Sequence, residues 1–356
     1  MLALRERKGH AMRRRQGIDR REALVGIGAL AMSAVVGAAP VKSERRKMND
    51  PSDRDSGPQA PLPWFLNACK ANQLVALGEM HRLATEHDFI RQLISDPRFS
   101  ADLVIEFGNG LYQDVLDAYI RGDSVSPKRL SEVWLNTTQS PIGPWSAPIY
   151  AELLAAVREA NRGGRGLRVL AGDPPIDWSK VKSGKDLHPF LSTRDEFYIS
   201  VVEKEVIARG RHGLLLIGGM HLLRTEPRGE GARFPSMPIV MPHGGSGTLN
   251  SEVEAIVKAW PVPSISRVAG TRLAGLTMAH LNSYVFDLEG KPKTFPPWRW
   301  EQLFDHYLYL GPASSLRWSE SAPSGDPALD AELERRRKIV AEILPPLPPL
   351  PPRPGR

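Results

Sequence analysis

The chain has 356 residues, of which 41% are hydrophobic and 24% charged, values typical of a globular protein with a sizeable core. Its single cysteine, Cys69, excludes an intramolecular disulfide framework and a cysteine-rich zinc site. The net charge of +7 arises at the N-terminus: residues 1–47 hold 12 Lys/Arg and 4 Asp/Glu, whereas the rest of the chain holds 35 and 36, so we expect no nucleic-acid partner.

Residues 1–41 have the pattern of an export signal. Arg20 and Arg21 precede the uncharged run 23–39, which is rich in Gly and Ala, and the small residues at 36–38 suit a signal peptidase. An arginine pair before a weakly apolar run is typical of twin-arginine export. We therefore predict an exported, periplasmic protein with no stable membrane span after cleavage. The alternative is a membrane anchor formed by an uncleaved signal, although a span needs about 20 strongly apolar residues.

Two further segments are predicted to lie outside the fold. Residues 42–62 are charged and rich in Pro and Ser, which indicates a disordered linker. Residues 344–356 ("LPPLPPLPPRPGR") form a proline-rich tail that should be extended and unpacked. The region between them, residues 63–343, is predicted to be a single domain.

Within this domain, short apolar runs alternate with helical patterns. Strands are predicted at residues 73–77, 103–106, 167–170 and 214–217, with later candidates at 283–288 and 306–310. Helices are predicted at residues 85–95, 113–120, 148–161 and 194–208. This alternation predicts an α/β fold with a mainly parallel central sheet. Because the strands are continuously apolar, we expect helices to cover both faces of that sheet.

Polar residues follow the predicted strands. Glu79 and His81 follow the first strand, Glu106 ends the second, Asp173 follows the third, and His221 follows the fourth. Ligands of open parallel sheets bind beyond the carboxyl ends of the strands, so these side chains are expected to converge on one cleft.

Each residue also has a structural interpretation. Glu106 is a candidate helix cap, Asp173 is a plausible turn residue before two prolines, and a lone histidine after a strand is often held by the backbone. His87 follows His81 by six residues and is a weaker candidate for the cleft. The joint pattern favours function, because burying so many ionisable groups at one edge is costly. The motifs of zinc peptidases, α/β-hydrolases and P-loop NTPases do not occur.

The chain resembles the superfamily that joins erythromycin esterases, ChaN-like haem-binding proteins and Tiki-type metalloproteases, and is most similar to little-studied bacterial ChaN-like members. The resemblance is carried by "LGEMH" (77–81), "VIEFGNGLYQDVLDAYIRG" (104–122), Arg194-Asp195 and "LLLIGGMH" (214–221), within roughly residues 63–315. It implies an EreA/ChaN-like α/β core with its cleft at the two G-x-x-H motifs. It also implies that Glu79, His81, Glu106 and His221 are the functional set, although branches of the superfamily differ in activity.

The first hypothesis is a hydrolase that acts on an ester or peptide bond of a small-molecule or peptide substrate. Glu79 or Glu106 would act as general base, and His81 and His221 would orient water or polarise the carbonyl. Arg194 is the candidate for stabilising the oxyanion, and Asp173 completes the predicted site. If a divalent metal takes part, His81, His221 and Glu106 are the expected ligands.

The second hypothesis is a haem- or metal-binding protein without catalysis. Histidine or tyrosine could ligate haem iron, and Tyr112 lies close to the second predicted strand. A third interpretation is a scaffold that has lost activity. It is the weakest of the three because both histidines and both glutamates are present.

Overall fold

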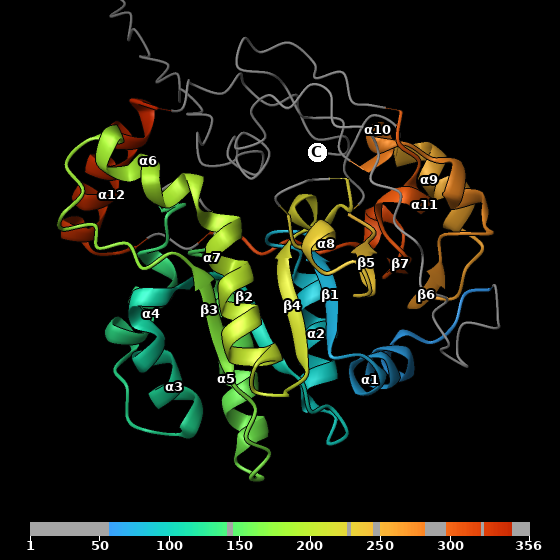
Figure 1. The fold of residues 1–356 in the computed structure, drawn as a ribbon, viewed down its shortest axis with the longest axis horizontal. Coiled ribbons are helices and arrows are strands. Elements are labelled where there is room, and N and C mark those ends of the chain that lie inside the picture. Colours follow the sequence, from blue (N-terminus) through green and yellow to red (C-terminus); the bar gives the residue numbers. More distant parts are fainter. Residues whose placement is uncertain are drawn as a thin grey trace, which may run out of the picture.

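The computed structural model describes residues 57–140, 145–225, 229–244, 250–281, 297–321 and 324–343. These residues form a seven-stranded sheet in the order β3-β2-β4-β1-β5-β7-β6 (Figure 1). The strands are β1 (Leu74–Glu79), β2 (Asp102–Asn109), β3 (Val169–Asp173), β4 (Gly213–Gly218), β5 (Ile239–Pro242), β6 (Ser264–Arg267) and β7 (His306–Tyr309). Every pairing is parallel except that of β6 with β7, which confirms the predicted mainly parallel α/β fold.

Helices cover both faces of the sheet, as its apolar strands require. They are α1 (Pro61–Ala71), α2 (Ala84–Ser95), α3 (Gln113–Arg121), α4 (Pro127–Leu135), α5 (Pro148–Asn161), α6 (Gly184–Ser192), α7 (Arg194–Val201), α8 (Glu230–Arg233), α9 (Asn250–Val257), α10 (Met278–Leu281), α11 (Trp300–Leu303) and α12 (Pro327–Ala341). The first five helices pack on one face, and α7, α9 and α11 pack on the other; Figure 1 shows α2 behind the sheet and α7 in front. All residues of β1, β2 and β4 are buried.

Several predicted elements are found with small shifts in their ends. Helix α5 spans the predicted residues, since Pro148 suits a first helical turn and lacks only an N–H that the helix does not use there. The predicted helix 194–208 is α7 continued by a π-helical segment, Val202–Ile207. Strands β5 and β6 were not predicted. The candidate strand 283–288 lies outside the described residues.

The predicted linker is too long at its C-terminal end. Helix α1 begins at Pro61, and the backbone N–H and C=O of Gln59 pair with Ile265 of β6, so residues from about 59 onward belong to the fold. Residues 42–56 of the predicted linker, the predicted signal at 1–41 and the tail at 344–356 lie outside the described residues. Among the helices that are described, none has the length and apolar character needed to cross a membrane.

The strand order contains a switch point, at which successive connections run to opposite sides of the sheet. The connection leaving β2 leads to β3 on one side, whereas the connection leaving β4, the neighbour of β2, leads past β1 to β5 on the other side. Such a switch point opens a crevice at the carboxyl ends of the two strands, where α/β proteins bind ligands. The predicted functional residues of β2 and β4 lie at this place.

Candidate functional site

Glycines let the strand ends approach one another closely. A Cβ on Gly78 would lie 2.9 Å from Cα of Gly219 and 2.7 Å from Sδ of Met241. A Cβ on Gly218 would lie 3.2 Å from Oε2 of Glu106, and without it the Gly218 N–H donates to that oxygen at 2.6 Å. The glycines of the two G-x-x-H motifs therefore allow the ends of β1, β2 and β4 to share one site.

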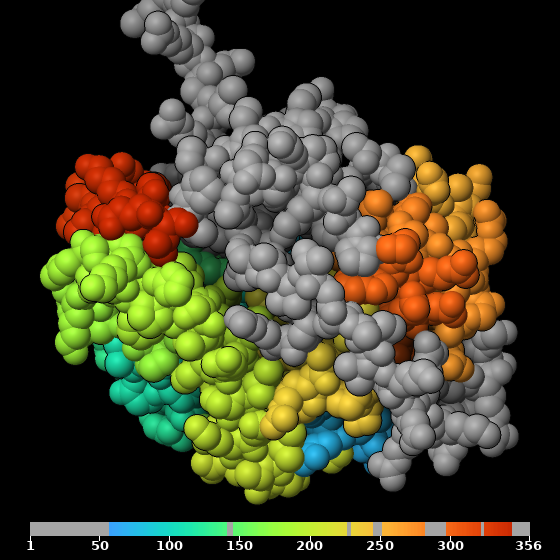
Figure 2. Space-filling model, turned by 45° about the horizontal axis from the view of Figure 1, so that its top comes forward, coloured from blue at the N-terminus to red at the C-terminus, as the bar shows by residue number. Residues whose placement is uncertain are grey.

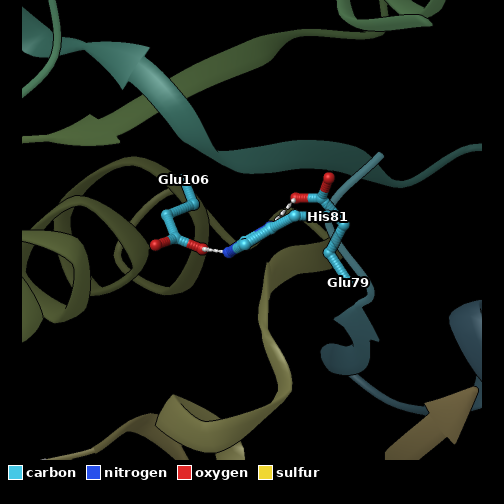
Figure 3. A group of neighbouring side chains, drawn as sticks. All are labelled: Glu79, His81 and Glu106. Atoms are coloured by element: carbon cyan, nitrogen blue, oxygen red, sulfur yellow. Dashed lines mark ion pairs between the residues drawn. The ribbon is translucent and has the colours of Figure 1, made fainter. Parts of the chain in front are cut away.

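His81 lies between two carboxylates (Figure 3). Its Nδ1 is 3.4 Å from Oε2 of Glu79, and its Nε2 is 3.9 Å from Oε2 of Glu106. The other oxygen of Glu79 pairs with Nε2 of His87 at 3.1 Å. Both carboxylates are buried, whereas the His81 side chain retains 13% of its exposure. His81 is thus the member of this cluster that a substrate or water can reach most directly.

Glu106 is the hub of the site. Besides the N–H of Gly218, it accepts hydrogen bonds on Oε1 from Arg194 at 2.7 Å and from Nε2 of Gln139 at 3.2 Å. Nε2 of His221 lies 3.9 Å from the same oxygen. The two imidazoles therefore approach opposite oxygens of one carboxylate, and the structure brings His81, His221 and Glu106 together.

Asp173 and Arg194 support this hub from β3 and α7. Asp173 accepts from both the backbone N–H and the hydroxyl of Thr138, each at 2.6 Å. Nε of Arg194 lies 3.3 Å from Oδ1 of Asp173, and Nη2 of the same side chain donates to Oε1 of Glu106. One guanidinium thus bridges two buried carboxylates from neighbouring strands.

His221 lies in the 3-10 turn Gly219–Leu222 after β4 and belongs to a second acidic cluster. Its Nδ1 pairs with Oδ1 of Asp195 at 2.7 Å. Asp195, His221 and Glu230, the first residue of α8, offer ligand atoms within 4.8 Å of one another. Glu230 is fully buried, and neither of its carboxylate oxygens has a hydrogen-bond partner.

The charges around Glu106 set its protonation and that of its neighbours. Burial alone would raise the pKa of Glu106, but His81, Arg194 and His221 outweigh burial and lower it. Burial likewise acts to raise the pKa of Glu79, and the attraction of His81 and His87 reverses this and brings it to about 2. Both glutamates are therefore ionised at neutral pH.

The neighbouring carboxylates raise the pKa values of His81 and His221. Burial opposes the charged form of His81, but Glu79 and then Glu106 raise its pKa above the usual value. For His221, the hydrogen bond to Asp195 overcomes burial and raises the pKa to about 9. His221 is therefore an imidazolium at neutral pH.

Two buried carboxyl groups, those of Asp173 and Glu230, have raised pKa values. Burial raises the pKa of Asp173 to about 6, although Arg194 and Thr138 oppose it. Burial also raises the pKa of Glu230 to about 8, with His221 opposing and Asp195 adding to the shift. Glu230 is thus protonated at neutral pH, and it can act as a hydrogen-bond donor there.

An aromatic wall borders His81. The indole of Trp145 meets the imidazole edge-on, with ring centroids 4.8 Å apart, and Tyr150 contacts Trp145, Phe107 and His87. This wall lies on one side of the ionisable groups and gives the site an apolar flank.

The donor atoms also permit a metal ion. Glu79, His81 and Glu106 offer ligand atoms within 4.8 Å of one another, as do the residues around His221. Nε2 of His221 and Oε2 of Glu79 are buried without a hydrogen-bond partner, which suits ligation. The site's own charges nevertheless nearly balance, because Arg194 and His221 already face the ionised carboxylates. The residues fit a metal but do not require one for neutrality.

All six residues predicted for the site lie in it: Glu79, His81, Glu106, Asp173, Arg194 and His221. His87, a weaker candidate, contacts Glu79. The prediction missed Thr138, Gln139, Trp145 and Glu230. The pairing of Asp195 with His221 was also missed, although Asp195 stood in the "RD" pair. None of these residues follows a predicted strand: Thr138, Gln139 and Trp145 lie in the connection between α4 and α5, and Glu230 lies in the charged run "RGEGAR".

Comparisons with known proteins yield weak likenesses. No family model and no curated protein match the sequence. The solved structure of the type III effector HopBA1 is 11% identical, with a TM-score of 0.38 over 56% of this chain and 91% of that one. A mutant of the erythromycin esterase EreC in its open conformation is 11% identical, with a TM-score of 0.45 over 74% of this chain and 95% of that one. Both values are too low to establish a family or an activity, so the predicted superfamily resemblance stays a prediction.

Proposed function

We propose that this protein is a hydrolase of ester or peptide bonds, with its catalytic groups at the β2–β4 switch point. The observation that carries the proposal is the position of His81, which is oriented by Glu79 and faces Glu106 at the mouth of the site. An imidazole paired with a buried carboxylate on one nitrogen, with its other nitrogen available, is the arrangement that activates water or a nucleophile.

His81 is the better general base, although the sequence suggested Glu79 or Glu106. Both carboxylates have lowered pKa values, and Glu106 and one oxygen of Glu79 have hydrogen-bond partners, so both groups attract protons weakly. A water molecule can bridge the 3.9 Å between Nε2 of His81 and Oε2 of Glu106 with one hydrogen bond to each atom. In this role the water oxygen attacks the carbonyl carbon, and its proton passes to Nε2 of neutral His81.

His221 is the proposed general acid of the reaction. As an imidazolium held by Asp195, it has an unpartnered Nε2 that can stabilise the oxyanion and then protonate the leaving group. Arg194 is already bonded to Glu106 and Asp173, so we assign it to holding these carboxylates rather than to the oxyanion. Proposed substrates are small molecules or peptides with an apolar group beside the scissile bond, which the indole of Trp145 would contact.

The alternative is a metal- or haem-binding protein without catalysis, and the unpartnered donors favour its metal form. His81, His221 and Glu106 would then hold the ion, with Glu79 and Asp195 orienting the two imidazoles. In a metal-assisted form of the hydrolase, a divalent ion held by these same residues would act as a Lewis acid on the carbonyl or on water. We also propose export to the periplasm, on the basis of residues 1–41 alone.

The first test is the hydrolysis of a panel of aryl esters and fluorogenic peptides by the purified chain. His81→Ala should lower kcat/KM by at least about 10²-fold, because a positioned general base contributes this much. His188→Ala, on the exposed side of α6, is the matched control and should leave turnover unchanged. Turnover by His81→Ala equal to that of the wild type would remove the assignment.

The pH profile tests the role of Glu79. Activity should rise with pH as His81 loses its proton, which gives the profile an acid limb. The midpoint of this limb should lie above the usual histidine pKa, because Glu79 and Glu106 raise the pKa of His81. In Glu79→Gln this attraction is lost and burial remains, so the limb should move to lower pH while kcat falls. A limb that stays in place would show that a different group acts as base.

Elemental analysis and a haem titration separate the alternatives. A stoichiometric divalent metal that is lost in His81→Ala, or a shifted Soret band on adding haem, would favour the binding protein if no ester or peptide turnover accompanies it. Ester or peptide turnover that survives chelation favours the metal-free hydrolase.

A further inference from the structure

The loop that follows α4 binds Asp173 and Glu106, the two buried carboxylates that Arg194 bridges. Residues 137–140 are buried, although they belong to no helix or strand. Thr138 donates twice to Asp173, and Gln139 donates to Glu106. This loop therefore helps to hold both carboxylates in place, together with Arg194 and the N–H of Gly218.

A single side chain from the far end of the sequence fastens this loop. The guanidinium of Arg336, on α12, donates to the carbonyl of Leu135 at 3.0 Å, to the side chain of Asn136 at 2.8 Å and to the hydroxyl of Ser140 at 3.2 Å. Glu332, one turn earlier, binds Nε of Arg336 at 2.7 Å and fixes its direction. Arg336 thus contacts both ends of the loop at once.

Trp178 completes the attachment. Its ring lies under the guanidinium at 4.8 Å, and its indole N–H donates to the carbonyl of Thr137 at 3.0 Å. Helix α12 is held by a small apolar cluster of its own, separate from the two faces of the sheet, in which Ile339 and Val340 pack with Ile176 and Trp178. Figure 2 shows α12 in red against the yellow-green segment that contains α6.

We propose that Arg336 is a positioning residue, which locks the loop of residues 136–140 so that Thr138 and Gln139 hold Asp173 and Glu106 in place. The proposal rests on the hydrolase function and extends it to a residue more than 190 positions away from the loop. Only a planar fork of donors can bind both ends of the loop, so lysine is not an adequate substitute.

The first measurement is kinetic. Arg336→Ala and Arg336→Lys should each lower kcat by about 10- to 100-fold with a smaller change in KM, since displacement of catalytic groups by about 1 Å has effects of this size. Arg337→Ala, whose side chain pairs with Glu334 on the same helix, is the control and should match the wild type. Wild-type kcat in Arg336→Ala would overturn the proposal.

Chemical rescue separates positioning from folding. A cavity of about 390 Å³ borders Arg336, Trp178 and Asn136 and gives small ions a route to the vacated place. Millimolar guanidinium should restore part of the kcat of Arg336→Ala, whereas the same concentration of potassium chloride should not. Equal effects of the two salts would count against the proposal.

Hydrogen exchange gives a readout that is independent of activity. In Arg336→Ala the amides of residues 135–140 should exchange about tenfold faster or more, while those of β1, β2 and β4 stay protected. Faster exchange across the whole sheet would overturn the proposal, because Arg336 would then stabilise the fold in general. If the wild type hydrolyses nothing, the hydrolase proposal fails, and the exchange result still decides whether Arg336 fastens the loop.

Discussion

Each imidazole of the site has its own carboxylate behind it. Glu79 orients His81, and Asp195 orients His221, so that both rings face Glu106. The two G-x-x-H motifs differ at the position of Glu79, where the second motif has Gly219. The structure supplies the missing carboxylate from α7 instead. The site is therefore symmetric in chemistry, although it is asymmetric in sequence.

Glu230 gives a prediction for stability at the scale of one residue. A carboxyl whose pKa is about 8 in the folded protein keeps its proton there, whereas the unfolded chain releases it near the usual value of 4.5. The wild type should therefore lose stability as pH rises from 4.5 to 8, by up to about 1.4 kcal/mol per pH unit. Glu230→Gln removes this dependence, so its unfolding free energy should fall less between pH 5 and 7.

Denaturant unfolding at several pH values measures this difference. Glu196→Gln, at an exposed position of α7, serves as the control and should follow the wild-type curve. Parallel curves for Glu230→Gln and the wild type would mean that Glu230 titrates normally in the folded protein.

The sequence predicted those site residues that end or directly follow a strand, because the local pattern of residues shows where each strand ends. Glu79, His81, Glu106, Asp173 and His221 end or follow apolar strands, and the carboxyl ends of parallel strands meet at one edge. Gln139 and Glu230 reach the same place through the packing of irregular segments. No period or spacing in the chain encodes such contacts, so these residues required the structure.

At the scale of elements, α7 is the part whose placement matters most. It begins with Arg194, and four residues later Tyr198 packs on β3 and donates its hydroxyl to the carbonyl of Val104 at 2.7 Å. The tyrosine ring fills the space where Gly172 lacks a side chain: a Cβ there would lie 2.3 Å from Cδ2 of Tyr198 and 2.9 Å from the carbonyl oxygen of Ile105. The distance between α7 and the sheet thus depends on this glycine.

Gly172→Ala should therefore push α7 outward and withdraw Arg194 from Glu106. We expect a loss of about 1–3 kcal/mol in the free energy of unfolding, as for other overpacked cores, together with a reduced kcat. Gly163→Ala is the control, since its Cβ would meet no atom closer than 3.8 Å. Denaturant unfolding and kinetics measure both effects, and wild-type values for Gly172→Ala would show that α7 does not depend on this contact.

For the molecule as a whole, the sequence predicted the class of fold and part of its extent. The four apolar strands and the helices between them were sufficient for a parallel sheet with two covered faces. β5 and β6 have only four residues each, which is too short for a clear apolar run in the sequence. β6 also pairs antiparallel with β7, so it does not belong to a βαβ unit. The order of strands, and with it the switch point, follows from packing between distant segments.

Limited proteolysis tests the predicted extent of the domain. Trypsin should cut the full chain first in the predicted linker, at sites such as Lys42, Lys47 or Arg54, and leave a resistant fragment that begins close to residue 57. Mass spectrometry of the fragment identifies its ends. Initial cleavage between residues 74 and 121 instead would show that the folded unit is not the one described.

The pairing of Gln59 with Ile265 has a consequence for the behaviour of the molecule in solution. β6 is the last strand on its side of the sheet, and an open outer strand can recruit a second sheet and start aggregation. The segment entering the domain occupies that margin through two backbone hydrogen bonds of 2.8 and 2.9 Å. If the proposed signal is cleaved at any point before Gln59, these two hydrogen bonds are kept and the backbone of Ile265 stays covered.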